Sequence, residues 1–183
     1  MTVSDKNPMI AAPLKLSDCS LISDGAAAVV LAHPSEFGRF RRVVGFRAAK
    51  MVSDYLPLSA KRLELFEGPA LAIQRAYAEA GIRVDNLDLA EVHDCFTIAE
   101  LQAVEALGLA AVGQGGAVVR ERQTDRAGRL PINLSGGLKA KGRGKHTDQL
   151  GRCSDCQRSA DGPCSWHPAT HRQMGPATLR PQR

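Results

Sequence analysis

The stretch "EVHDCFTIAELQAVEALGL", residues 91–109, joins a predicted strand to a predicted helix and decides the fold class. Thr97 and Glu100 have the spacing of a capping box, in which the two side chains bind free backbone N–H groups at a helix start. Apolar residues then recur at helical spacing, and the alternating segment 87–92 before them predicts a strand. His93-Asp94-Cys95-Phe96 is therefore expected between a strand end and a helix N-terminus, where ligands of α/β proteins gather.

The chain upstream of this stretch contributes further elements of the same class. Two apolar runs, residues 24–32 and 42–49, predict buried strands. Residues 69–80 predict a helix, with Pro69 at its first position and Gly81 just past its end. The order strand, strand, helix, strand, helix indicates α/β packing. The glycine-rich segment 113–119 has no phosphate-loop spacing and is interpreted as a loop.

His93 and Cys95 are the first candidate catalytic residues. A thiol beside a histidine at a helix N-terminus can form an activated nucleophile. Two residues apart on an extended chain, however, the two side chains point the same way without necessarily touching. The alternative is a structural, buried cysteine beside a polar histidine, and the spacing leaves both interpretations open.

A second candidate is the loop "NLSGGLKAKG", residues 133–142. Its turn-forming and basic residues are those that a substrate loop would use: Asn133, Ser135, Gly136, Gly137, Lys139 and Lys141. Asparagine and serine fold back on the backbone, and paired glycines let the backbone approach a ligand closely. The lysines could meet a phosphate. A plain surface loop is the alternative.

The third candidate lies in the C-terminal tail. Its ligand spacing, C-x-x-C followed by C-x-x-H, is typical of zinc sites and is formed by Cys153, Cys156, Cys164 and His167. The spacer between the two pairs is short, and a tail biased toward Cys, Arg, His and Pro also produces such spacings by chance. After Gly142 the tail has no Ile, Val or Phe and only two Leu, so it is expected to be disordered.

The charge and the termini set further expectations. The net charge is +5, and residues 141–183, with eight basic and three acidic residues, carry all of the excess. No aromatic interleaving or nucleic-acid motif accompanies it, so no nucleic-acid partner is expected. No apolar stretch is long enough to span a bilayer. The absence of a secretory signal and the five cysteines favour reduced thiols in a cytoplasmic setting.

Three segments together resemble the C-terminal half of a thiolase: "DCSLISDGAAAVVLA", "EVHDCFTIAELQAVEALGL" and "GRLPINLSGGLKAKG". They follow in the order and spacing of the sterol-carrier-protein-type and bacterial lipid-transfer thiolases, the acetyl-CoA acetyltransferase-like branch. In that branch His-Asp-Cys-Phe stands where other thiolases have Asn-Glu-Ala-Phe. The resemblance covers residues 8–142, which defines an expected but incomplete domain.

The resemblance implies half of a thiolase-type layered α/β fold and an acyl transfer between coenzyme A thioesters. It implies acyl-CoA as the ligand, the thioester as substrate and no further cofactor. His93 matches an oxyanion-hole position. Cys95 matches an alanine of other thiolases, which argues against it as the nucleophile. A homo-oligomer or a separate N-terminal thiolase half is the implied partner.

The sequence departs from the thiolase pattern at Gly142. The family's catalytic Gly-His-Pro motif should begin there, but Arg143 follows, and no tail cysteine stands in Cys-x-Gly. Residues 143–183 are therefore expected to be a disordered or out-of-frame tail, and the isolated chain to be inactive or to need a partner chain. Two alternatives stay open: a non-catalytic acyl-CoA-binding, lipid-binding or interaction module, and a zinc-binding adaptor that uses the tail.

Overall fold

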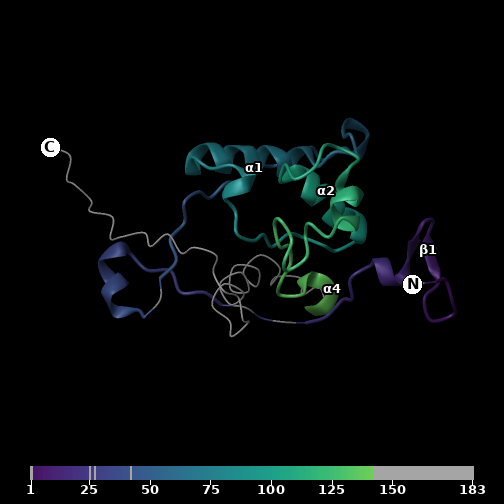
Figure 1. The fold of residues 1–183 in the computed structure, drawn as a ribbon, viewed down its shortest axis with the longest axis horizontal. Helices are drawn as coiled ribbons and strands as arrows, with labels where there is room; N and C mark the ends of the chain where they lie inside the picture. The colour runs from purple at the N-terminus through teal and green to yellow at the C-terminus, as the bar shows by residue number, and fades with distance from the viewer. Residues whose placement is uncertain (1, 25, 27, 42, 142–183) are drawn as a thin grey trace.

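The computed structural model of this 183-residue chain describes residues 2–24, 26, 28–41 and 43–141 (Figure 1). The expected tail disorder and the zinc ligands fall outside these residues. The strands are β1 (Met9–Ala11) and β2 (Leu14–Lys15), and the α-helices are α1 (Glu67–Ala80), α2 (Thr97–Ala106), α3 (Gly115–Arg120) and α4 (Gly137–Lys141). Short 3-10 helices are η1 (Leu16–Asp18), η2 (Pro34–Arg39), η3 (Leu58–Ala60) and η4 (Val84–Asn86).

The helix α1 confirms the strongest helical prediction. It ends as expected at Gly81, which takes the left-handed conformation with φ 65° and donates its N–H to the Tyr77 carbonyl. It begins two residues earlier than predicted, at Glu67, so Pro69 lies at its third position. This shift is tolerated because the first N–H groups of a helix have no intrahelical partner, and proline lacks an N–H.

The helix α2 forms where the sequence predicts it, but the capping box is wrong. The helix begins at Thr97, its N-cap is Phe96, and no side chain makes a cap hydrogen bond. Thr97 is thus already inside the first turn, where its hydroxyl cannot serve as the cap. The Phe96 carbonyl instead accepts the first helical bond, from the Ala99 N–H at 3.0 Å.

The interpretation of residues 113–119 as a loop is also wrong, because α3 occupies most of them. The Glu105 carboxylate accepts the Gly115 N–H at 2.8 Å and so binds one free donor at the α3 N-terminus. Val118 is buried and supplies the apolar contact that holds this short helix. Tertiary packing and a distant carboxylate override the low helix propensity of two glycines.

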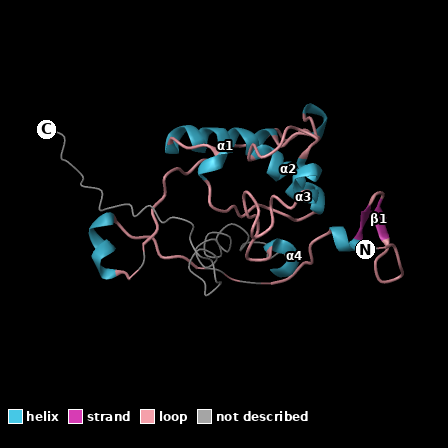
Figure 2. Ribbon diagram, in the orientation of Figure 1, coloured by secondary structure: helices cyan, strands magenta, loops and turns pink. Residues whose placement is uncertain are grey.

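The core lies where α2 packs against α1 on one side and α3 on the other. Its buried members are six apolar side chains: Val104, Leu107, Leu109, Val118, Leu130 and Ile132. Val104 and Leu130 have exposed fractions of 0% and 1%. Figure 2 shows that this helical part is compact, whereas the chain before α1 extends away from it in long loops.

The strands predicted at 24–32 and 42–49 are wrong for the residues that the structure describes. The described residues of both segments lie in no ladder, and Val30 and Phe46 are 81% and 72% exposed. Between the two segments η2 stands away from α1 and α2 (Figure 1). A strand needs a neighbour for its backbone hydrogen bonds, and the described sheet pairing is limited to the β1–β2 hairpin and isolated bridges.

The predicted strand at 87–92 is reduced to one parallel bridge between Ala90 and Ile132. The Ala90 N–H donates to the Pro131 carbonyl at 2.9 Å, and the Asn133 N–H donates to the Ala90 carbonyl at 2.9 Å. This bridge matters for function because it aligns the chain before α2 with the glycine-rich loop before α4. Among the described residues, none of the helices has both the length and the apolar character needed to cross a membrane.

Candidate functional site

The candidate site forms where residues 91–97 run beside residues 131–139. Both segments were singled out from the sequence, and the 33 residues 98–130 separate them in the chain. The Ala90–Ile132 bridge sets their register, and side chains from each segment then bind the backbone of the other. The structure thus joins the predicted histidine segment and the predicted substrate loop into one unit.

Asn133 joins the two segments first. Its φ is 52°, a left-handed conformation that asparagine tolerates better than most residues. Its side-chain oxygen accepts the Val92 N–H at 2.8 Å. Asn133, predicted to bind its own backbone in a turn, therefore binds the neighbouring segment instead. The Nδ2 atom is buried without an acceptor in the structure. Such an unsatisfied donor typically costs about 1–3 kcal/mol.

Ser135 forms the second connection, to Glu91. Its hydroxyl donates to Glu91 Oε2 at 2.8 Å, and its N–H donates to Oε1 of the same carboxylate at 3.2 Å. One carboxylate therefore binds both donors of the serine. This arrangement fixes the loop immediately before its two glycines.

Asp94 forms the third connection and is the most buried polar residue described, with an exposed fraction of 3%. Its carboxylate accepts the Leu138 N–H at 2.8 Å and the Lys139 N–H at 3.5 Å. Gly137 has φ 60°, and a Cβ atom there would lie 2.2 Å from Asp94 Oδ2. The sequence predicted that this glycine lets a ligand approach the backbone closely. In the structure the group that approaches it is the Asp94 carboxylate of the same chain.

An N-terminal segment closes the other side of the junction. The Ser20 N–H donates to the Cys95 carbonyl at 2.9 Å, and Cys19 forms an antiparallel bridge with Phe96. Lys139 donates its ammonium to the carbonyls of Ser17 and Cys19, the latter at 2.9 Å. The sequence suggested that the Lys139 ammonium could bind a phosphate. In the structure it binds backbone oxygens of the chain itself.

His93 lies at the centre of these contacts and is half-buried. The residue before it, Val92, donates to Asn133, and the residue after it, Asp94, binds the loop at Leu138. The histidine backbone is therefore held on both sides, four residues before α2 begins. Cys95 is half-buried with a free thiol, and Gly136, with φ 101°, is exposed at the loop surface.

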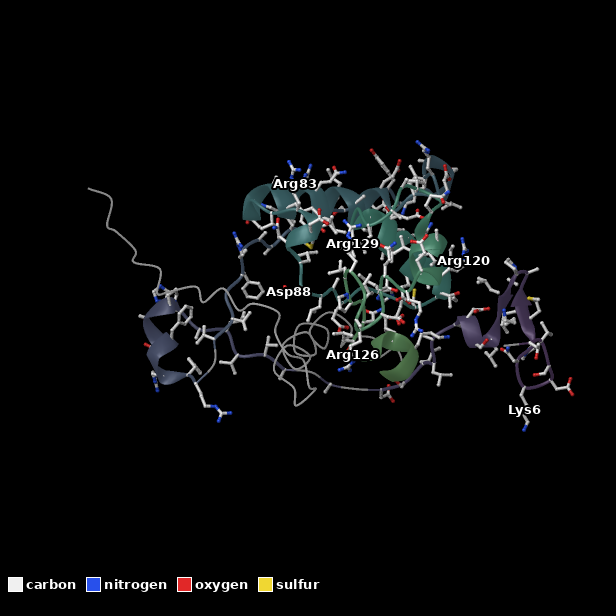
Figure 3. All side chains as sticks on the ribbon, in the orientation of Figure 1. Lys6, Arg83, Asp88, Arg120, Arg126 and Arg129 are labelled. Atoms are coloured by element: carbon white, nitrogen blue, oxygen red, sulfur yellow. The ribbon has the colours of Figure 1, made fainter. Side chains whose placement is uncertain are left out.

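A cavity of about 720 Å³ with a mixed polar and apolar wall adjoins the loop and includes Asn133 in its wall. Its lining includes Glu100, from the first turn of α2, and Arg126, from the loop after α3; Figure 3 labels Arg126. Burial, and to a lesser degree the negative charge of Asp94, raises the pKa of the Glu100 carboxyl above its ordinary value. This wall can therefore present a carboxyl group that holds its proton more firmly than an exposed glutamate does.

The sequence did not reveal that the Glu91 and Asp94 carboxylates hold this site together, and it assigned Glu100 only to a capping box. Glu91 and Asp94 flank the histidine at a spacing of three, which was the available signal. Their partners lie 44 residues away, so no local pattern could identify them. Within the described ranges no group of three or more His, Cys, Asp or Glu side chains could hold a metal ion.

Comparison with known proteins gives a consistent family signal. Residues 52–150 match the protein family described as "Thiolase C-terminal domain-like". The chain is 40% identical over 137 residues to the acetyl-CoA acetyltransferase of Methanothermobacter thermautotrophicus, which covers 73% of this chain and 36% of that protein. It is 35% identical over 150 residues to sterol carrier protein 2 of Oryctolagus cuniculus, covering 78% of this chain and 27% of that protein.

A third relative is the benzoylsuccinyl-CoA thiolase subunit BbsB of Thauera aromatica. It is 31% identical over 137 residues, covering 73% of this chain and 35% of that protein. The chain thus spans between 27% and 36% of the length of these three relatives. Among solved structures, the Ltp2-ChsH2(DUF35) aldolase aligns with a TM-score of 0.47 at 24% identity, over 51% of this chain and 24% of that chain.

Proposed function

Because the chain belongs to the thiolase C-terminal domain-like family, we propose that it supplies one side of an active site that transfers acyl groups between coenzyme A thioesters. The family assignment confirms the resemblance that its three sequence motifs predicted. Homology to acetyl-CoA acetyltransferases and to sterol carrier protein 2 accords with this lineage. The substrate of the proposed site is an acyl-CoA thioester, and no further cofactor takes part.

The observation that carries the proposal is the fixed position of His93. Oxyanion stabilisation requires a hydrogen-bond donor that is already in place when negative charge develops on the thioester oxygen. The Val92 N–H donates to Asn133 Oδ1 and the Asp94 carboxylate accepts the Leu138 N–H, so the chain is held on both sides of the histidine. The adjacent N-terminus of α2 adds a positive electrostatic contribution toward that charge.

The loop 133–137 has a supporting role in this proposal. Asn133 and Ser135 hold the histidine segment through Val92 and Glu91, and Gly137 accommodates Asp94. Gly136 is the exposed member of the set, so its backbone is the part of the loop that a thioester can approach. The loop therefore acts mainly by positioning, with substrate contact assigned to Gly136.

The nucleophile of the proposed reaction is the cysteine of a thiolase N-terminal half. That half is part of the same polypeptide or of a partner chain, and a homo-oligomer is the second partner arrangement proposed. Free thiols at Cys19 and Cys95 accord with a reducing, cytoplasmic setting. Cys95 has no catalytic role in this scheme.

The test is an acetoacetyl-CoA cleavage assay of a full-length thiolase in which residues 8–142 of this chain replace the matching segment, so that the N-terminal cysteine and the Gly-His-Pro motif are both present. His93→Ala is expected to lower kcat by about 10²–10³, the usual effect of removing one oxyanion donor. Cys95→Ala is the matched control and should leave kcat nearly unchanged. Loss of activity in Cys95→Ala with full activity in His93→Ala would reverse the two roles. Acyl-CoA binding without turnover in any combination would favour a non-catalytic binding module.

A further inference from the structure

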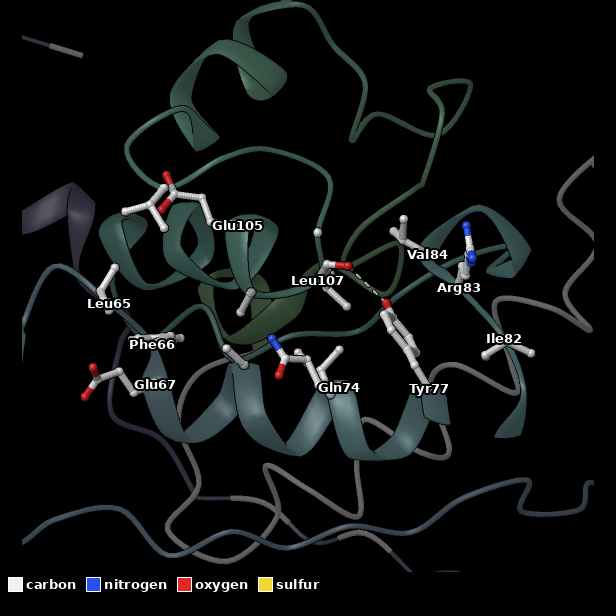
Figure 4. A pocket seen from close by; sticks show the side chains of 15 residues that line it. Leu65, Phe66, Glu67, Gln74, Tyr77, Ile82, Arg83, Val84, Glu105 and Leu107 are labelled. Atoms are coloured by element: carbon white, nitrogen blue, oxygen red, sulfur yellow. Dashed lines mark hydrogen bonds between the residues drawn. The ribbon is translucent and has the colours of Figure 1, made fainter. Parts of the chain in front are cut away.

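A second cavity, of about 580 Å³, lies between α1 and the C-terminal half of α2 (Figure 4). Most of its wall is apolar, with contributions from Phe66, Ala70, Ile73, Leu107 and Val112. A concave, mainly apolar cavity of this size with a few polar groups is the usual form of a small-molecule site. Two small residues also line it: Ala70 on α1, and Gly108 just after the end of α2.

The polar groups of this cavity divide between its two ends. Glu67 and Glu105 lie toward one end, and Arg83 lies toward the other (Figure 4). Between them the Tyr77 hydroxyl donates to the Leu107 carbonyl at 3.1 Å, so the middle of the cavity offers no free hydroxyl proton. The cavity therefore has an acidic end, a mainly apolar middle that also includes the Gln74 amide, and a basic end.

Arg83 is available to a ligand. Its neighbour Asp85 forms an ion pair with Arg129, and the Arg83 guanidinium itself makes no ion pair with any residue that the structure describes. At the acidic end, by contrast, the Glu105 carboxylate already accepts the Gly115 N–H. An unpaired guanidinium beside an apolar cavity favours a ligand with a carboxylate head and an apolar chain.

We propose that the α1–α2 cavity binds a medium-chain fatty carboxylate, with its chain along Ile73 and its carboxylate at Arg83. The acidic end sets the orientation, because a reversed ligand would place its carboxylate beside Glu67 and Glu105. The apolar wall supplies most of the affinity through burial of the chain, and the guanidinium selects the head group.

This cavity is separate from the His93 site. Phe96 and Glu105 mark the two ends of α2, about 14 Å apart at 1.5 Å per residue. The binding proposed here involves a free carboxylate without coenzyme A and does not rest on the acyl-transfer proposal. Its test measures binding alone, so the two proposals fail independently.

The experiment is a calorimetric titration of the full chain with octanoate, octanol and octylammonium. Octanoate is expected to bind most tightly and octylammonium least. Arg83→Gln should weaken octanoate binding about fivefold, the effect of one partly exposed charge pair, and leave octanol binding unchanged. Arg83 is exposed, so this variant keeps the fold. Failure of all three probes to bind, or an equal loss for octanoate and octanol in Arg83→Gln, would overturn the proposal.

The second part of the experiment fills the cavity with a larger side chain. Ala70→Phe should abolish binding of octanoate and octanol, because its ring occupies the space between the helices. Leu71→Phe is the matched control: this neighbour is 39% exposed, lies outside the cavity wall and should leave binding unchanged. Full binding in Ala70→Phe would place the ligand on the exposed apolar segments before α1 and overturn the assignment.

Discussion

Residues 67–139 and residues 17–57 have similar apolar content, but the described residues of the first region are packed and most of those of the second are exposed. Val104 in the first region is completely buried, whereas Val30 in the second is 81% exposed. The helices of the first region satisfy their backbone hydrogen bonds internally and need only one apolar contact face. The predicted strands of the second region need neighbouring strands before they can bury anything. An apolar run is therefore buried in the core only where its backbone N–H and C=O groups also find hydrogen-bond partners.

The candidate site lies at the contact between these regions. Its histidine segment and glycine loop belong to the packed region, and the segment 17–20 reaches it through Lys139, Cys95 and Phe96. A substitution at this contact therefore reports on both regions together. Substitutions inside each region report on one region alone.

The sharpest test of the comparison is a leucine truncation in each region. Leu130→Ala, at a side chain that is 1% exposed, should lower the free energy of unfolding by about 2–5 kcal/mol, because it removes core contacts and leaves a cavity. Leu56→Ala, at a side chain that is 94% exposed, should change it by less than about 0.5 kcal/mol. Urea denaturation followed by circular dichroism measures both. A cost above 2 kcal/mol at Leu56 would show that the second region packs in solution.

Gly137→Ala should have the next largest effect. Its φ of 60° is unfavourable for alanine, and the new Cβ would lie 2.2 Å from the buried Asp94 carboxylate. We expect a loss of roughly 1–3 kcal/mol in unfolding free energy, together with loosening of the loop. Gly81→Ala is the control: φ is similar, at 65°, but a Cβ there has open space, so it should cost only about 1 kcal/mol. Equal costs would show that Asp94 does not occupy this position.

Lys139→Met tests the contact between the regions. The change keeps the apolar length of the side chain and removes the donor to Ser17 and Cys19. The loss in global stability should be about 1 kcal/mol. The larger effect should be local, with faster amide hydrogen exchange at residues 17–20 and unchanged exchange in α1 and α2. Uniform acceleration across the chain would mean that this segment is part of the main cooperative unit.

The elements that the sequence could predict are those with local causes. The α1 helix follows from its own spacing and from Gly81, and α2 follows from its apolar periodicity. The α3 helix depends on a bond from Glu105, which no local pattern reveals, and the strand predicted at 87–92 pairs only through the Ala90–Ile132 bridge. For the site, His93 and the loop could be singled out separately. Their joining by Glu91 and Asp94 spans 44 residues and required the structure.

The smallest expected effect is a pH-dependent one at Glu100. Burial and the nearby Asp94 charge raise the pKa of its carboxyl above 4.5, so the folded state binds this proton more tightly than the unfolded state. Stability contributed by the protonated group is therefore present at low pH and is lost as pH rises through the raised pKa. Glu100→Gln keeps the side-chain size and cannot ionise, so it should unfold at higher urea concentration than the unmodified chain at pH 7. The difference should shrink as the pH approaches 4.5.

Asp88→Asn, at an exposed carboxylate, is the control and should show no such gain. If Glu100→Gln is instead less stable at pH 7, the ionised carboxylate must be stabilising the fold, and the cavity beside Asn133 must hold it in its charged form.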